Sequence, residues 1–181
     1  MNKEELLESG QAEIQIIIFK LGSEEYAVPI TCVQEIIMNQ EKTRIPKSPS
    51  FVEGVINLRG QIIPVIDGKK QFNLAALKNE TNLDERIMVI ESNDQTIGMI
   101  VDEVSEVIHL AVDDIELPPV EATDQNDYIW GVGKYHERLF ILVDPEKFLN
   151  FNQIIENPKT STDTKSIENN KKEKSKNLEL V

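Results

Sequence analysis

The 181-residue sequence contains few side chains that carry chemistry: one cysteine, two histidines and one tryptophan. The single cysteine, Cys32, excludes an internal disulfide and a cysteine-rich zinc site. His109 and His136 are far apart and have no histidine or cysteine at the spacing of metal ligands. We therefore expect neither a metal nor a cofactor.

The sequence also has little that points to a membrane. Its first eight residues are acidic and hold no apolar stretch long enough for a signal peptide. No run approaches the ~18 apolar residues of a membrane span. These absences predict a soluble, cytoplasmic protein without direct membrane insertion.

Positive charge is scarce, with 19 Lys and Arg against 32 Asp and Glu and a net charge of -13. This sign disfavours binding to nucleic acid and to anionic lipid surfaces. Residues 152–181 contain six lysines, five acidic residues and few apolar ones, so we expect a disordered tail there. The acidity then belongs to residues 1–151, whose net charge is -14; we expect 1–13 to be a flexible N-terminus and 14–151 a folded domain.

The folded part is predicted to be all-β. Short apolar runs rich in β-branched residues are separated by turn signals such as Arg59-Gly60. Many short strands with close turns are typical of barrels and sandwiches. The expected strands are 14–21, 25–30, 54–58, 61–66, 87–91, 96–101, 129–132 and 139–143.

An internal repeat organises these strands. Residues 26–37 align with 97–108 at an offset of 71, and 54–55 and 63–67 align with 131–132 and 140–144 at an offset of 77. Two matches in the same order predict two similar halves, about 16–72 and 87–148, each a small barrel of about five strands.

Each half is also predicted to contain a short helical turn after its second strand. Thr31 and Asp102 suit the N-cap position, and an apolar face follows each of them at helical spacing. These faces either pack on their own barrels or line a partly exposed seam between the barrels. Periodicity alone leaves both readings open.

No set of residues in the sequence forms a credible catalytic site. Cys32 has no histidine nearby in the sequence to activate it. A hydrolase with two carboxylates on a β scaffold remains as a distant alternative, for which the repeat offers only Asp67 and Asp144. The scarcity of reactive side chains favours a binding protein.

One hairpin, over residues 54–67, presents a cation in this acidic protein. Its tight turn is predicted at Arg59-Gly60, where Gly60 can adopt a positive φ without steric cost. Pro64 removes a hydrogen-bond donor from the second strand, so that strand is predicted to lie at an edge or to be bulged. Arg59 is either an exposed residue without a role or the residue that a partner recognises.

The sequence resembles the CheW-like coupling proteins of bacterial chemotaxis over roughly residues 16–150. The resemblance rests on these landmarks in order: Glu24 to Ile30, Val33 to Ile36, Asn57 to Gly60, Ile97 to Val107, Asp113 to Ile115, and Leu139 to Asp144. It implies two interlocked five-stranded barrels of the Src-homology-3 kind, which agrees with the repeat. It departs from the family at Gly68, where a leucine is usual, and in its tail, which is too short and polar for a receiver domain.

The resemblance also implies a function and its sites. Similar proteins are non-catalytic adaptors that join the cytoplasmic tip of methyl-accepting chemoreceptors to the regulatory domain of the histidine kinase CheA in receptor arrays. The positions that match the receptor groove between the barrels are Val33, Glu35, Gly54, Arg59, Gly98 and Val104. Kinase contacts are expected near the barrel ends, at Ile37, Arg44, Leu117, Pro118 and Val120. An adaptor of another chemosensory pathway, such as twitching motility, is the nearest alternative.

Overall fold

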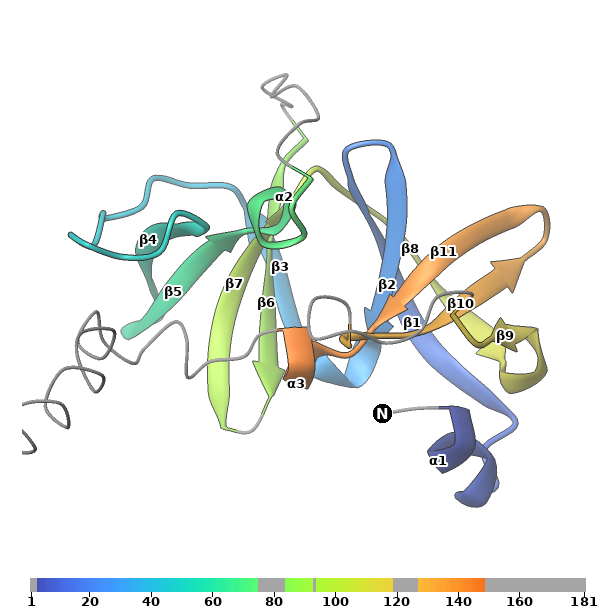
Figure 1. Ribbon diagram of the computed structural model, residues 1–181. Helices are drawn as coiled ribbons and strands as arrows, with labels where there is room; N and C mark the ends of the chain where they lie inside the picture. The colour runs from blue at the N-terminus through green and yellow to red at the C-terminus, as the bar shows by residue number, and fades with distance from the viewer. Residues whose placement is uncertain (1–2, 75–83, 93, 119–126, 149–181) are drawn as a thin grey trace, which may run out of the picture.

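The computed structural model describes residues 3–74, 84–92, 94–118 and 127–148 (Figure 1). The predicted tail and Val120 lie outside the described residues. The helices are short: α1 (Lys3–Glu8), α2 (Gly68–Gln71) and α3 (Pro145–Phe148), with the 3-10 turns η1 (Ile30–Cys32) and η2 (Val112–Asp114). The strands are β1 (Glu13–Leu21), β2 (Glu24–Pro29), β3 (Val33–Met38), β4 (Val52–Leu58), β5 (Gln61–Asp67), β6 (Arg86–Ser92), β7 (Gln95–Val101), β8 (Glu103–Ala111), β9 (Ile115–Glu116), β10 (Ile129–Tyr135) and β11 (Arg138–Val143).

These strands form two sheets, in agreement with the predicted all-β class. One sheet has the order β8-β1-β2-β11-β10-β9 and the other β3-β6-β7-β5-β4. Side chains from the edge and central strands of each sheet meet in one apolar cluster, because each sheet curls around its own interior. We call them the first and the second barrel. The first barrel encloses Ile16, Ile18, Leu110, Phe140 and Leu142, and the second encloses Ile56, Ile63, Val65, Ile87 and Val89.

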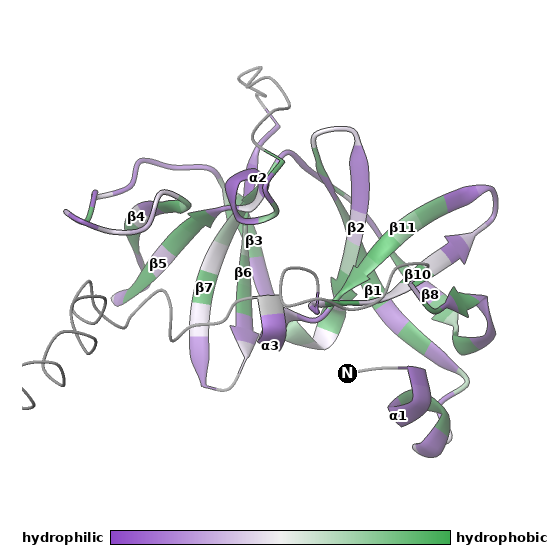
Figure 2. Ribbon diagram, in the orientation of Figure 1, coloured by the Kyte–Doolittle hydropathy of each residue, from purple (hydrophilic) through white to green (hydrophobic). Residues whose placement is uncertain are grey.

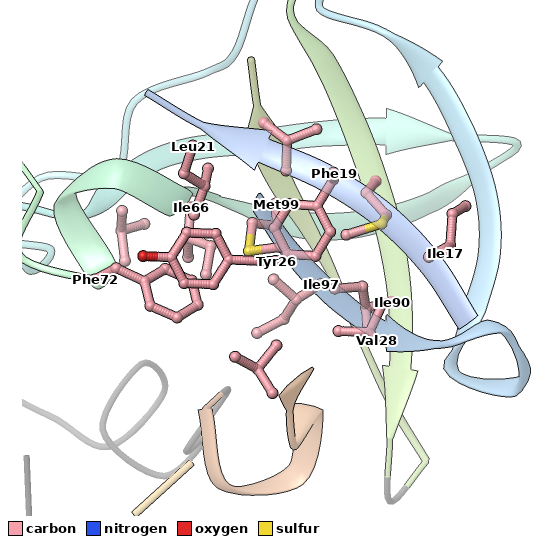
Figure 3. Packing of buried hydrophobic residues seen from close by; sticks show 14 residues of the cluster. Ile17, Phe19, Leu21, Tyr26, Val28, Ile66, Phe72, Ile90, Ile97 and Met99 are labelled. Atoms are coloured by element: carbon pink, nitrogen blue, oxygen red, sulfur yellow. The ribbon is translucent and has the colours of Figure 1, made fainter. Parts of the chain in front are cut away.

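A third cluster joins the two barrels. It combines side chains of β1 and β2, including Phe19 and Tyr26, with side chains of β6 and β7, including Ile90 and Met99 (Figure 3). Strand β1 therefore buries consecutive residues, Ile16 to Phe19, since one of its faces meets the first barrel's interior and the other meets the second barrel. Figure 2 shows hydrophobic colouring on the strands of both barrels.

The barrels do not coincide with the two halves of the repeat, which corrects the prediction that each half is a barrel. The first barrel takes β1 and β2 from the first half and β8, β10 and β11 from the second. The second barrel takes β3, β4 and β5 from the first half and β6 and β7 from the second. At the offsets of the repeat, the strands β8, β1, β2, β11 and β10 correspond in this order to β3, β6, β7, β5 and β4. The two sheets therefore have the same strand order, apart from the two-residue β9. The chain exchanges strands because β3 pairs with β6 and β8 pairs with β1.

The helical stretches predicted to follow Thr31 and Asp102 are wrong, although the 3-10 turn η1 does come directly after β2. After η1, residues 33–38 form β3, and residues 103–111 form β8. Exposure alternates along β3, and Thr31 caps no helix, because the residue before η1 is Pro29. The spacing of Val33, Ile36 and Ile37 suited a helix, but their β-branched side chains favour a paired strand once β6 is available.

Two smaller expectations also differ from the structure. Part of the segment expected to be flexible forms α1, whose Leu6 is 4% exposed in the first barrel's cluster. Strand β5, which contains Pro64, is an inner strand between β4 and β7. It tolerates Pro64 on both sides. The opposite residue on β4, Val55, exchanges its backbone hydrogen bonds with Thr43 at 2.9 Å, and the pairing of β5 with β7 begins only at Val65.

Candidate functional site: the β3 face and the Arg59 hairpin

The Arg59 hairpin is the connection between β4 and β5. Leu58 pairs with Gln61, so Arg59 and Gly60 form a two-residue turn, and both have a positive φ, of 52° and 89°. This is the conformation of a type I′ turn, which suits the twist of the strands. The Gly60 N–H donates to Asn57 Oδ1 at 2.8 Å, which closes the turn and holds Arg59 at its tip.

Arg59 reaches across the second barrel to β3. Its Nη2 donates to Glu35 Oε2 at 2.9 Å, and its side chain remains 79% exposed whereas that of Glu35 is 24% exposed. Strands β3 and β4 are the two edges of this sheet, so the ion pair closes the barrel at one end. Two residues expected in the receptor groove, distant in the sequence, are thus brought together.

Val33 and Val104 occupy equivalent positions in the two halves. Both are half-buried and pack against the cluster that joins the barrels. Val33 opens β3 and Val104 lies near the start of β8, where the chain has just passed from one barrel to the other. The exposed atoms of Val33 and Val104 form an apolar surface between the barrels, which we call the seam.

Gly54 and Gly98 belong to the interior. A Cβ at Gly54, whose φ is 147°, would lie 2.4 Å from the Thr43 carbonyl oxygen. A Cβ at Gly98 would lie 2.7 Å from Ile87 Cγ2 and 3.3 Å from Val65 Cγ2. Both glycines are buried, so the structure gives them packing roles within the second barrel.

The residues expected to contact the kinase are dispersed. Ile37 is half-buried against the interior of the second barrel, and the exposed Arg44 lines a cavity of about 490 Å³ together with Lys47 and Lys70. Leu117, which follows β9 of the first barrel, is 71% exposed. Pro118 is half-buried beside it.

The first barrel contains a second ion-pair group, which was not predicted from the sequence. Arg138 donates to Glu25 at 2.7 Å and also pairs with Glu106, the repeat equivalent of Glu35. The hydrogen bond from Arg138 lowers the pKa of the Glu25 carboxyl, and the two carboxylates raise the pKa of Arg138. The identity of Glu35 and Glu106 at the offset of 71 was the signal that could have revealed this pair.

Exposed apolar side chains also recur by the repeat. Ile36 and Val107 are 39% and 44% exposed, and Ile62 and Leu139 are 62% and 64% exposed. The offsets of 71 and 77 relate the members of each pair. Each barrel therefore carries equivalent apolar positions on its outer surface.

The structure gives no support to the carboxylate hydrolase. Asp67 Oδ1 accepts from the N–H of Lys70, and Asp144 Oδ1 accepts from the N–H of Glu146 at 2.9 Å, so each carboxylate caps the short helix that follows it. The two residues end equivalent strands in different barrels. Within the described residues, no group of three or more His, Cys, Asp or Glu could hold a metal ion. No described helix is long and apolar enough to cross a membrane.

Comparison with known proteins shows which proteins this chain is similar to. The family model described as a CheW-like domain matches residues 15–153. The chemotaxis protein CheW of Helicobacter pylori is 37% identical over 142 residues, which are 78% of this chain and 85% of that protein. The chemotaxis protein CheW of Klebsiella aerogenes is 38% identical over 137 residues, 75% of this chain and 81% of that protein. The crystal structure of the scaffolding protein TtCheW from Thermoanaerobacter tengcongensis matches with a TM-score of 0.67 and 39% identity, over 73% of this chain and 89% of that one.

Proposed function

Because this chain belongs to the CheW-like family, we propose that it is a non-catalytic adaptor that joins methyl-accepting chemoreceptors to the histidine kinase CheA. The observation that carries the proposal is the family match over the whole double barrel, residues 15–153. On this proposal the protein acts in the cytoplasm, where its partners attach it to receptor arrays.

The receptor surface is the exposed part of the β3 face, the Arg59 hairpin and the seam. Val33 and Val104 offer apolar contact to a helical receptor tip. Arg59 is an exposed cation within residues 1–151, whose net charge is -14, so it can fix the register of the tip by pairing with a receptor carboxylate or a helix carbonyl. Gly54 and Gly98 support this surface from inside. Gly54 allows β4 to lie close to Thr43, and Gly98 allows β7 to lie close to the side chains of Ile87 and Val65.

The kinase surface comprises the barrel ends. Ile37 and Arg44 lie at the second barrel, and Leu117 and Pro118 lie after β9 of the first. Val120 belongs to the same proposed surface by sequence. The exposed apolar side chain of Leu117 and the exposed cation of Arg44 are the two described groups best placed to contact a partner.

Coupling between the two surfaces is a linkage. A receptor that changes conformation changes its fit to the seam, and the adaptor transmits this difference to the kinase through the barrel ends. The free energy that the adaptor transmits is at most the difference between its binding free energies for the two receptor states.

The test is a pull-down with a receptor cytoplasmic fragment and the kinase, scored for a ternary complex and for stimulated autophosphorylation. We expect the parent protein to form the complex and Arg59→Glu to lose the receptor while it keeps the kinase. Lys134→Glu, which reverses an exposed cation on β10, is the matched control. A parent protein that binds neither partner contradicts the proposal.

A further inference from the structure

The described chain passes between the barrels at two places. Residues 29–33 lead from β2 of the first barrel to β3 of the second, and residues 101–103 lead from β7 of the second barrel to β8 of the first. We call these the Cys32 crossing and the Asp102 crossing. The repeat makes them equivalent, since Asp102 aligns with Thr31 at the offset of 71.

The Asp102 crossing is tied to both barrels by a buried carboxylate. One oxygen of Asp102 accepts from the Gly22 N–H at 2.6 Å, and the other accepts from Lys69 Nζ at 2.7 Å. Gly22 lies in the β1–β2 turn of the first barrel, and Lys69 lies in α2, which follows β5 of the second. The Lys69 and Asp102 side chains are only 11% and 10% exposed, so water screens their attraction weakly.

The Cys32 crossing cannot form the same ion pair. Lys69 is replaced by Glu146 at the equivalent position of the second half, and Asp102 is replaced by Thr31. Among the described residues, no ion pair involves residues 29–33. A cavity of about 440 Å³, lined partly by Pro29, Cys32 and Pro145, lies against this crossing.

We propose that Lys69 and Asp102 are positioning residues that set the angle between the two barrels. The barrels pivot about the Asp102 crossing, and the Cys32 crossing opens and closes. Val33 is the last residue of the Cys32 crossing, whereas Val104 directly follows the Asp102 crossing. The pivot therefore moves Val33 relative to Val104 and changes the receptor seam, a consequence that rests on the proposed function.

Paired substitutions can separate this positioning role from a contribution to stability. Removal of one partner leaves a buried charge unpaired and destabilises the fold, whereas removal of both is often close to neutral. In Lys69→Met the apolar stem of the side chain is kept, and in Asp102→Asn an acceptor for Gly22 is kept. The double variant K69M/D102N therefore keeps much of the packing and loses the Lys69–Asp102 ion pair, together with the longer contact of 4.0 Å between Lys69 and Glu85.

The experiment measures the distance between the barrels by pulsed electron spin resonance. Spin labels are attached at Ile62→Cys and Leu139→Cys in a Cys32→Ala background, because these exposed positions are equivalent in the two barrels. We expect a narrow distribution in the otherwise unchanged protein and in Lys69→Arg. We expect a broadened or shifted distribution in K69M/D102N at a similar melting temperature.

The matched control is the Lys70–Glu53 pair, whose side chains are 39% and 27% exposed. It lies outside both crossings and joins α2 to β4 of the second barrel, so K70M/E53Q should leave the distribution unchanged. A distribution in K69M/D102N that superposes on the reference, or equal broadening in the control, overturns the proposal.

The distance measurement needs no partner and stands whether or not the proposed function holds. With the receptor fragment, K69M/D102N should bind about tenfold more weakly, while kinase binding is unchanged. Unchanged receptor binding together with broadened distances would overturn the link from pivot to seam. Failure of the parent protein to bind the receptor would contradict the proposed function alone.

Discussion

The Arg59 guanidinium lies 2.9 Å from the Glu35 carboxylate and closes the second barrel at the tip of the β4–β5 hairpin. The pair joins a turn to the edge strand β3, 24 residues away in the sequence. Arg59 is nevertheless 79% exposed, so the pair leaves most of the guanidinium available to a partner. An exposed ion pair of this kind contributes little to stability, about 0–1 kcal/mol.

Charge reversal at this pair should affect binding far more than folding. Arg59→Glu is expected to reduce co-sedimentation with receptor arrays and to change the free energy of unfolding by no more than about 1 kcal/mol. The exchange variant E35R/R59E restores the ion pair but moves the cation to β3. If this variant binds the receptor as the parent does, the receptor recognises the ion pair and does not require the cation at position 59. Parental co-sedimentation by Arg59→Glu would show that Arg59 has no receptor role.

Gly98→Ala should destabilise the second barrel. The new Cβ would lie 2.7 Å from Ile87 Cγ2, which forces a shift in a packed interior and costs about 1–3 kcal/mol. Thermal unfolding measures the effect. Gly60→Asn is the control, because no atom lies within 4 Å of a Cβ there and asparagine tolerates its positive φ. A Gly98→Ala variant with a parental melting temperature and lost receptor binding would instead indicate direct contact with the receptor.

The Arg138–Glu25 pair should stabilise the fold in a pH-dependent way. The hydrogen bond from Arg138 lowers the pKa of Glu25 from 4.5 in the folded state. A lowered carboxyl pKa gives stability that is present above the unfolded pKa and is lost as the pH falls through the folded one. Arg138→Gln should therefore be less stable than the parent near neutral pH, and the difference should shrink below about pH 4. Urea unfolding across this range tests it, and a constant difference down to pH 3 would contradict it.

Cys32 should react slowly with thiol reagents. Burial raises the pKa of its thiol, and the nearby carboxylates of Asp144 and Glu146 raise it further. Because the thiolate is the reactive form, we expect modification at neutral pH at least about tenfold slower than for an exposed thiol. Lys134→Cys in a Cys32→Ala background gives the exposed reference. Equal rates for the two thiols would contradict the expectation.

Leu117→Glu should weaken kinase binding and leave the fold intact. Leu117 is 71% exposed, so a charge there costs the folded state little, whereas it would oppose an apolar contact. Leu7→Glu is the matched control, since Leu7 is 53% exposed on α1, outside the residues 15–153 that match the family model. Titration with the kinase measures the affinities, and equal affinities for the two variants would remove Leu117 from the kinase surface.

Local patterns predicted most of the strands and the type of connection at Arg59. The eight predicted strands correspond to β1, β2, β4, β5, β6, β7, β10 and β11. These strands are buried on one or both faces, so each is an apolar run rich in β-branched residues that can be recognised in the sequence. The two strands that were predicted as helical turns, β3 and β8, each pair with a strand of the other half of the repeat, as do β2 with β11 and β5 with β7. No local pattern states which half supplies the partner of a strand.

The sequence by itself determined the all-β class, the twofold repeat and the cation at the hairpin tip, because periodicity, turn residues and charge are local properties. Only the tertiary structure decided that the barrels exchange strands and that Gly54 and Gly98 lie inside the second barrel. It alone showed that Glu35 meets Arg59 and that Asp102 meets Lys69. These relationships depend on long-range pairing, whose free energy comes from burying the faces of β1, β2, β6 and β7 against one another.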